Sequence, residues 1–183
     1  MDEIETAPVT GRKTLLLMRH AKSSWQDADC PDIERPLNKR GRQAADAMAP
    51  LVAAWQPQWI GCSIAQRTRA TLLPIIDNLT APAEIELTAA LYDSNEAAYL
   101  RLLRALPNTI NRALLIGHNP VLEELCQMLI GSAEPNALER LMEKLPTGTL
   151  VVLECAIARW SDLAPQTADL RDTIRPRDLL NQR

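Results

Sequence analysis

The sequence predicts an α/β domain with three layers, in which helices cover both faces of a central, mostly parallel sheet. Short continuous apolar segments alternate along the chain with longer segments whose apolar residues recur at helical spacing. Continuous apolar strands are typical of a sheet covered on both faces, and their alternation with helices favours parallel pairing. The 183 residues suffice for one domain. We therefore expect a loose tail over residues 1–12 and a single domain over 13–183.

The expected strands are short apolar segments, and several end abruptly in polar residues. In chain order they are Thr14–Met18, Trp59–Ser63, Glu84–Leu87, Ala113–Ile116 and Leu150–Glu154. Residues 156–160 are expected to pair with the last of them as a hairpin. A final element is expected within residues 167–183. The polar segment 21–37 holds two prolines and is expected to be a loop.

The first two expected helices each contain a proline. Asn38 is expected to cap a helix over residues 39–55, because its short side chain can accept a backbone N–H. Pro50 lies inside that segment and should kink the helix or end it early. A second helix is expected to begin near Arg67, with Pro74 disturbing its middle.

Two further helices follow from apolar stripes. Residues 95–106 are expected to form a helix whose inward side chains are Ala98, Leu102 and Ala105. Residues 121–130 are expected to form another, which Gly131 ends. Its inward side chains are expected to be Leu122, Leu125, Cys126 and Leu129.

Composition argues against several kinds of partner. A net charge of −3 gives no broad basic surface for nucleic acid. No apolar run is long enough to cross a bilayer and no secretory leader opens the chain, so we expect a cytoplasmic protein without a membrane partner. The four cysteines are scattered and only two histidines exist, so we expect reduced, mostly buried thiols. No metal and no cofactor are expected.

Both histidines follow expected strands. His20 comes after the strand at 14–18 with only Arg19 between, and His118 comes after the strand at 113–116 with only Gly117 between. Ligands of open α/β sheets bind beyond the carboxyl ends of the strands. A single histidine at a strand end is more often structural. Because both histidines share this placement, we expect two imidazoles to face one pocket.

Arginines near these positions favour an anionic ligand. Arg19 precedes His20, and Arg67 lies where the second helix is expected to begin. Phosphoryl transfer needs positive charge on the equatorial oxygens, and the planar guanidinium donates in parallel to such oxygens. The helix N-terminus adds backbone donors. Lys22 is expected at the electropositive rim.

These residues lie in motifs that resemble those of the histidine phosphatase superfamily. The segment Leu17–Lys22 resembles its arginine-histidine-glycine motif, in the form with alanine that is typical of the SixA branch of phosphohistidine phosphatases. The resemblance covers about residues 13–180 and implies a phosphoglycerate mutase-like fold. The other matching segments are Arg35–Asn38 followed by Gly41, Ser63–Thr68 with Thr71, Ile116–Pro120, Pro146–Gly148 and Arg175-Pro176.

The resemblance implies roles for the matched positions. His20 would be the nucleophile that takes the phosphoryl group, and His118 would complete the phosphate pocket. Arg19 and Arg67 would hold the phosphoryl oxygens. Two further matched residues, Ser63 and Asn119, are expected to bind substrate.

The resemblance leaves two candidates for the general acid. Many relatives carry an acidic residue in a segment that resembles residues 91–96, which makes Asp93 the first candidate and Glu96 the second. Either carboxylate could equally be a solvated group beside the helix that follows. A second departure is Ile64, which stands where the family usually has proline.

Phosphohistidine is the substrate that best tolerates a weak or absent acid. Imidazole, with a free pKa near 6.5, leaves phosphorus more readily than an alkoxide does. The segment between Thr71 and His118 is short, which predicts an open site able to admit a protein-borne group.

The sequence therefore predicts a phosphatase that works through a phosphohistidine intermediate, with a phosphorylated protein or a small phosphorylated metabolite as its partner. Alternatives that use the same residues are a phosphatase for small phosphate monoesters and a mutase. A non-catalytic phosphate-binding module would not need the nucleophile. A nucleotide-binding domain would need a glycine-rich loop after the first strand, and residues 19–22 offer none.

Overall fold

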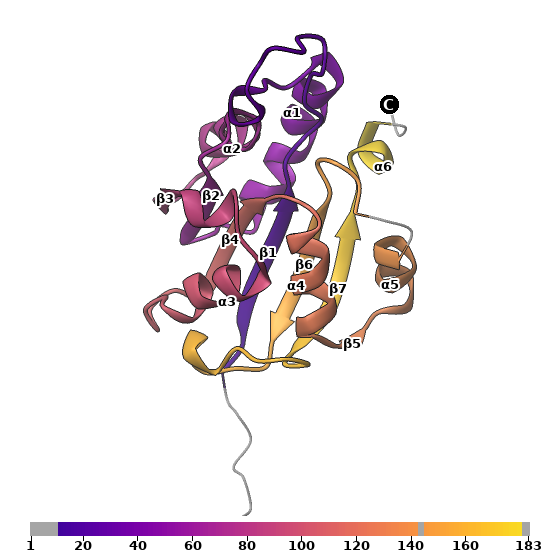
Figure 1. Cartoon of the computed structure of the whole chain (residues 1–183). Helices are drawn as coiled ribbons and strands as arrows, with labels where there is room; N and C mark the ends of the chain where they lie inside the picture. Colours follow the sequence, from indigo (N-terminus) through magenta and orange to yellow (C-terminus); the bar gives the residue numbers. More distant parts are fainter. Residues whose placement is uncertain (1–10, 143–144, 181–183) are drawn as a thin grey trace, which may run out of the picture.

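A seven-stranded sheet forms the centre of the described structure, a computed structural model that describes residues 11–142 and 145–180 (Figure 1). The expected tail over residues 1–12 lies, for its first ten residues, outside the described part. The sheet order is β3-β2-β4-β1-β6-β7-β5. The strands are β1 Lys13–Arg19, β2 Trp59–Ser63, β3 Glu84–Thr88, β4 Arg112–Gly117, β5 Ile130–Ala133, β6 Leu150–Cys155 and β7 Ala168–Ile174.

The sheet is mixed but mostly parallel. β1, β4, β2 and β3 run parallel to one another in that spatial order. β6 is antiparallel to both of its neighbours, β1 and β7, and β5 is parallel to β7. The predicted α/β class with a mostly parallel central sheet is thus confirmed.

Helices cover both faces of the sheet (Figure 1). One face packs against α1 and α2, with Leu16 and Met18 of β1 in the shared core. The opposite face packs against α3 and α4, with Leu15 and Leu17 in that core. Successive side chains of β1 point to opposite faces of the sheet, so this strand contributes to the cores on both sides. The helices are α1 Lys39–Ala54, α2 Gln66–Asn78, α3 Glu96–Arg104, α4 Val121–Leu129, α5 Pro135–Met142 and α6 Pro176–Leu180, with short 3-10 turns η1 Asp32–Glu34, η2 Ala89–Leu91 and η3 Trp160–Asp162.

The N-terminus of α1 follows the prediction, but its proline does not end the helix. The Asn38 side chain accepts the backbone N–H of Gly41 at 2.8 Å. α1 continues through Pro50 to Ala54, so the expected early end is wrong. Pro50 is exposed, as is Asp46, whose carbonyl it leaves without an N–H donor. Water can therefore satisfy that carbonyl.

The buried stripe of α3 differs from the predicted one. Tyr99, Leu100 and Leu103 are buried, whereas Ala105 is exposed. The larger side chains bury more apolar area, and the Tyr99 hydroxyl finds a buried acceptor in the Leu91 carbonyl at 2.7 Å. In α4 the four expected side chains are buried, as predicted.

The C-terminal part contains elements that the sequence did not predict. β7, and not residues 156–160, pairs with β6, so the expected hairpin is wrong. Residues 156–160 lead into η3, where Trp160 is buried and donates its indole N–H to the Ile110 carbonyl at 2.7 Å. Gly131 lies in β5, where a Cβ would come within 2.4 Å of the Gln166 carbonyl oxygen. Within residues 11–142 and 145–180, no helix is long and apolar enough to cross a membrane.

Candidate active site

A pocket of about 410 Å³ opens at the carboxyl ends of β1 and β4. Four basic side chains line it, against one carboxylate, Asp32, among the described residues. Such a balance suits a multiply charged anion. The lining residues are Arg19, His20, Lys22, Ser23, Trp25, Asp32, Arg35, Arg67, His118, Asn119 and Thr147.

Strand pairing brings the two histidines together. β1 and β4 are parallel neighbours in which Arg19 lies opposite Gly117, so the residue after each strand reaches the same edge. The His20 backbone N–H also donates to the Gly117 carbonyl at 3.1 Å. The imidazole centroids of His20 and His118 are 5.1 Å apart, and the rings are tilted by 54°.

His20 presents a free ring nitrogen. Its Nδ1 lies 2.7 Å from the Ala21 carbonyl oxygen, which can only accept a hydrogen bond. Nδ1 therefore carries the proton, and Nε2 keeps its lone pair. Burial lowers the pKa of His20 to about 4, and the nearby Arg67 and Arg19 charges lower it too, against the opposing bond to Ala21. The ring is neutral at pH 7 and able to act as a nucleophile.

His118 has the opposite tautomer. The Arg67 guanidinium, always a donor, has Nη2 at 3.4 Å from His118 Nδ1, so Nδ1 is the acceptor. Nε2 then carries the proton and donates to the Ser63 hydroxyl at 2.8 Å. Burial, followed by electrostatic interactions with His20 and Arg67, lowers the pKa of His118 to about 3.

Arg67 is fixed at the first turn of α2. Its Nη1 donates to the Asp32 carbonyl at 2.6 Å and its Nη2 to Asp32 Oδ2 at 2.9 Å. The Arg67 carbonyl accepts the Thr71 hydroxyl at 2.7 Å, and that hydroxyl accepts the Ala21 N–H at 3.0 Å. Thr71 therefore ties α2 to the segment that carries His20.

Arg19 is held from the opposite side of the pocket. Its Nη1 donates to the Leu145 carbonyl at 2.7 Å, and Asn119 donates to the same carbonyl at 3.2 Å. Glu123 accepts from Asn119 at 2.6 Å and from the Leu145 N–H at 3.0 Å. Arg19 Nε and Asn119 Oδ1 are buried without a hydrogen-bond partner among the described residues. An unsatisfied buried donor beside a basic pocket suits an anionic oxygen.

The remaining predicted residues lie at different depths. Lys22 is exposed and lines the pocket, as expected for a rim residue. Ser63 is fully buried behind His118 and does not line the pocket. Asp93 is exposed and Glu96 is half-buried at the start of α3, both outside the lining. The assignment of the acid to Asp93 stays a prediction.

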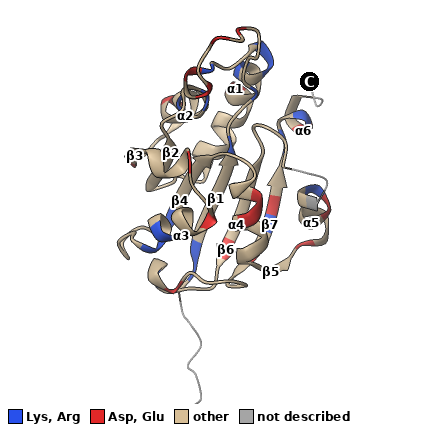
Figure 2. Cartoon of the chain, viewed as in Figure 1, with Lys and Arg blue, Asp and Glu red and all other residues tan. Residues whose placement is uncertain are grey.

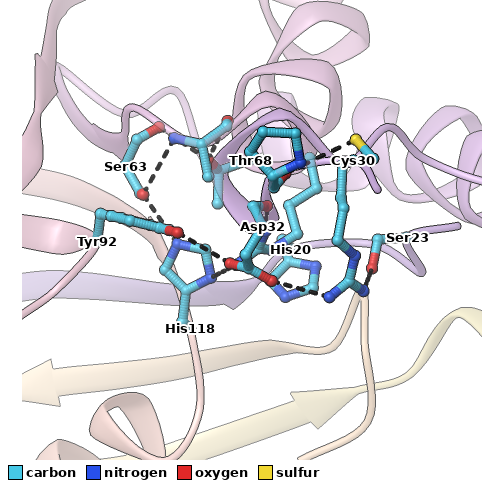
Figure 3. Close-up of polar contacts among 12 residues, drawn as sticks. His20, Ser23, Cys30, Asp32, Ser63, Thr68, Tyr92 and His118 are labelled. Carbon is cyan, nitrogen blue, oxygen red and sulfur yellow. Dashed lines mark hydrogen bonds and ion pairs between the residues drawn. The ribbon is translucent and has the colours of Figure 1, made fainter. Parts of the chain in front are cut away.

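Asp32 is the pocket residue that the sequence reasoning missed. Its carboxylate joins Arg67, Arg35 and Tyr92, which come from three separate segments (Figure 3). Asp32 lies in an acidic loop together with Asp27 and Asp29, where a carboxylate looks solvated. The one local signal was the spacing of three residues to Arg35, within a segment already matched to a family motif.

Sequence relatives support one family. Residues 15–96 match the model of the histidine phosphatase superfamily, branch 1. An uncharacterized protein of Mycobacterium leprae is 30% identical over 159 residues, which cover 84% of this chain and 96% of that protein. An uncharacterized chloroplastic protein of Arabidopsis thaliana is 33% identical over 132 residues, 66% of this chain and 61% of that protein.

Solved structures share the whole fold. The candidate phosphohistidine phosphatase SixA of Nakamurella multipartitia is 27% identical with a TM-score of 0.74, covering 91% of this chain and 97% of that one. Its counterpart from Agrobacterium tumefaciens is 28% identical with a TM-score of 0.74, covering 90% and 98%. SixA complexed with tungstate shares the fold at 20% identity, with a TM-score of 0.69 and coverage of 91% and 99%. Taken with the match to the family model, this agreement makes the chain a phosphatase of the histidine phosphatase superfamily, branch 1.

Proposed function

We propose that this chain is a phosphohistidine phosphatase in which His20 takes the phosphoryl group from a phosphorylated protein. The observation that carries the proposal is the state of His20. Its Nδ1 carries a proton and donates it to the Ala21 carbonyl in a hydrogen bond, its pKa is lowered to about 4, and its Nε2 is free in a basic pocket. A buried neutral imidazole of this kind is a nucleophile at pH 7.

In the first step, the Nε2 lone pair of His20 attacks phosphorus. The bond from phosphorus to the leaving atom breaks, and its electron pair stays on that atom. Arg67 and Arg19 neutralise charge on the equatorial oxygens, and the unsatisfied Arg19 Nε is one donor available for this. A bound dianion also offsets the positive charges that lower the pKa of His118, so that His118 can gain a proton and donate to the phosphoryl group.

In the second step, water attacks the phosphohistidine formed on His20. The P–Nε2 bond breaks, its electron pair returns to Nε2, and the water protons leave with phosphate and solvent. Because the proton stays on Nδ1 throughout, hydrogen-bonded to the Ala21 carbonyl, His20 leaves as a neutral imidazole and not as an imidazolate. The enzyme therefore returns to its starting state without a metal or a cofactor.

The need of the leaving group for a proton favours phosphohistidine over a phosphate ester as the substrate. An alkoxide needs a proton from a neighbouring acid, and the one carboxylate in the described lining, Asp32, is engaged by two arginines. Trp25 is 78% exposed at the pocket wall, where a protein surface can contact it. The structural relatives named as candidate phosphohistidine phosphatases are 27% and 28% identical, which also supports this substrate class.

A substrate panel tests the proposal. Wild type and His20→Ala would be assayed with a phosphohistidine peptide, a sugar phosphate and a phosphoserine peptide, with and without EDTA. The wild type is expected to show its highest kcat/KM on the phosphohistidine peptide. His20→Ala is expected to lose this activity, and EDTA is expected to leave the wild-type activity unchanged. A preference for the sugar phosphate would instead make the chain a small-molecule phosphatase. A loss in EDTA that Zn²⁺ or Mg²⁺ reverses would contradict the metal-free mechanism.

A further inference from the structure

Asp32 is placed to contact a substrate as well as the protein. Its Oδ2 accepts from Tyr92 Oη at 2.9 Å and from Arg67 Nη2 at 2.9 Å, while its Oδ1 accepts from Arg35 Nη1 at 2.8 Å (Figure 3). A carboxylate oxygen has two acceptor sites. Oδ2 is therefore filled by these bonds, whereas Oδ1 keeps acceptor capacity. The side chain is 52% exposed and lines the pocket, so this capacity is open to a ligand.

The surroundings keep this carboxylate ionised. Burial pushes the pKa of Asp32 upward, but hydrogen bonds from Tyr92 and Arg67 and the charges of Arg67 and Arg35 outweigh burial and lower it. The loop from β1 to α1 that carries Asp32 also holds other acidic residues (Figure 2). An ionised carboxylate has no proton to donate, but it is a strong acceptor for a cationic N–H.

Within the proposed function, on which this inference rests, we infer that Asp32 Oδ1 accepts the ring N–H of the substrate phosphohistidine. Asp32 thereby selects substrates whose phosphoryl group is carried by a protonated, cationic imidazole ring, which leaves as a neutral imidazole. An ester presents an oxygen that becomes anionic as it leaves, and the same carboxylate disfavours it. Asp32 is thus a catalytic residue that determines the class of leaving group.

The bond accounting requires no proton from the protein. In the reactive substrate, one ring nitrogen carries the phosphoryl group and the other carries a proton, so the ring is a cation. His20 Nε2 forms its bond to phosphorus while the P–N bond of the substrate breaks, and that electron pair returns to the substrate nitrogen. The product is a neutral imidazole that still bears its N–H. Asp32 acts by stabilising the cationic form that can react.

The second step of the reaction uses an equivalent hydrogen bond, which lies within the protein. His20 Nδ1 donates to the Ala21 carbonyl at 2.7 Å, which holds a proton on the ring that later loses phosphate. The Ala21 carbonyl serves the phosphoenzyme as Asp32 Oδ1 serves the substrate. The Asp32 oxygen is charged, whereas the Ala21 oxygen is neutral. Only the substrate ring arrives from solvent, so only its acceptor has to select the protonated form of the ring.

The test compares Asp32→Asn with Asp29→Asn, a change of equal charge at an exposed position of the same loop outside the pocket lining. Each variant and the wild type would be assayed for kcat/KM on a phosphohistidine peptide and on p-nitrophenyl phosphate. Asp32→Asn is expected to lower the phosphohistidine value about ten- to a hundredfold more than the ester value, as for loss of a charged hydrogen bond to one substrate and not the other. Asp29→Asn should leave the ratio unchanged.

Each outcome separates the inference from the function on which it rests. Equal losses on both substrates would show that Asp32 only positions Arg67, and no loss on either substrate would show that it is not used; either result overturns the inference. A wild type without phosphohistidine activity would overturn the proposed function itself. The wild-type pH profile gives a second readout. Its kcat on phosphohistidine should fall only above the pKa of the free substrate ring, because Asp32 stabilises the bound cation; a fall at that pKa would contradict the inference.

Discussion

The imidazole of His20 lies with its centroid 5.1 Å from that of His118, and the two rings are hydrogen-bonded through different nitrogens. His20 donates from Nδ1 to the Ala21 carbonyl, whereas His118 donates from Nε2 to Ser63. Both rings are neutral, but Nε2 of His20 is free, whereas Nδ1 of His118 accepts from Arg67. This difference makes His20 the proposed nucleophile. The proposed role of His118 is to gain a proton when the charged phosphoryl group binds.

Replacing the proposed nucleophile should abolish turnover without emptying the pocket of positive charge. His20→Ala is expected to lower kcat by at least about 10³-fold, because no other free imidazole nitrogen is placed to attack. Tungstate should still bind, since Arg19 and Arg67 remain. Rates near those of the wild type would exclude His20 as nucleophile. Retained turnover together with lost tungstate binding would also contradict the assignment.

The planar guanidinium of Arg67, with its several N–H donors, should contribute more to activity than its positive charge alone. Arg67→Lys keeps one positive charge but loses the paired bonds to Asp32 and the contact with His118. We expect kcat/KM to fall about 10²–10³-fold and phosphate inhibition to weaken. Arg69→Lys, at an exposed position of the same helix, is the matched control and should change neither. Similar effects of the two changes would remove Arg67 from the site.

Glu123 should act on the pocket through Asn119 and Leu145. Glu123→Ala removes both acceptor contacts and is expected to cost about 1–3 kcal/mol of unfolding free energy and to raise KM, because the Leu145 carbonyl would no longer hold Arg19 in place. Glu123→Gln keeps an acceptor oxygen and should restore much of both. Glu124→Ala, exposed on the same helix, serves as control in urea unfolding and kinetics. An unchanged KM in Glu123→Ala would refute the positioning role.

Acid should destabilise the fold through the two buried histidines. Their folded-state pKa values are lowered to about 4 and about 3, whereas an unfolded histidine titrates near 6.5. Between about pH 6.5 and 4 the unfolded chain therefore binds more protons, and stability falls as pH falls. Urea unfolding at intervals between pH 7 and 5 measures this slope. The double variant His20→Asn, His118→Asn should show a flatter dependence, and equal slopes would contradict the proposed burial of neutral rings.

Asp93 can be tested separately from Asp32. If Asp93 donates the proton to ester leaving groups, Asp93→Asn should lower kcat on alkyl phosphate esters by about 10²-fold and spare phosphohistidine peptides. This pattern is the reverse of that expected for Asp32→Asn. Equal losses on both substrates, or no loss on either, would remove Asp93 from the mechanism and agree with its place outside the pocket lining.

The sequence by itself determined the strands near the site and the position of its two histidines. Continuous apolar segments such as Thr14–Met18 can be stable only when buried on both faces, which predicts the central strands of an α/β sheet. Since parallel strands end at one edge, His20 and His118 were expected to meet there. The motifs around Arg19 and Arg67 were equally local and needed no tertiary information.

Only the tertiary structure decided what surrounds those residues. Asp32 joins Arg67 and Tyr92 across long stretches of chain, and it lies in the single 3-10 turn η1, which is too short to show the periodicity that marks helices and strands. The tautomers of His20 and His118 likewise depend on acceptors and donors that folding supplies. Hydrophobic patterning repeats along the chain and can be recognised there, whereas a polar contact between loops exists only once the packed core has fixed where each loop lies.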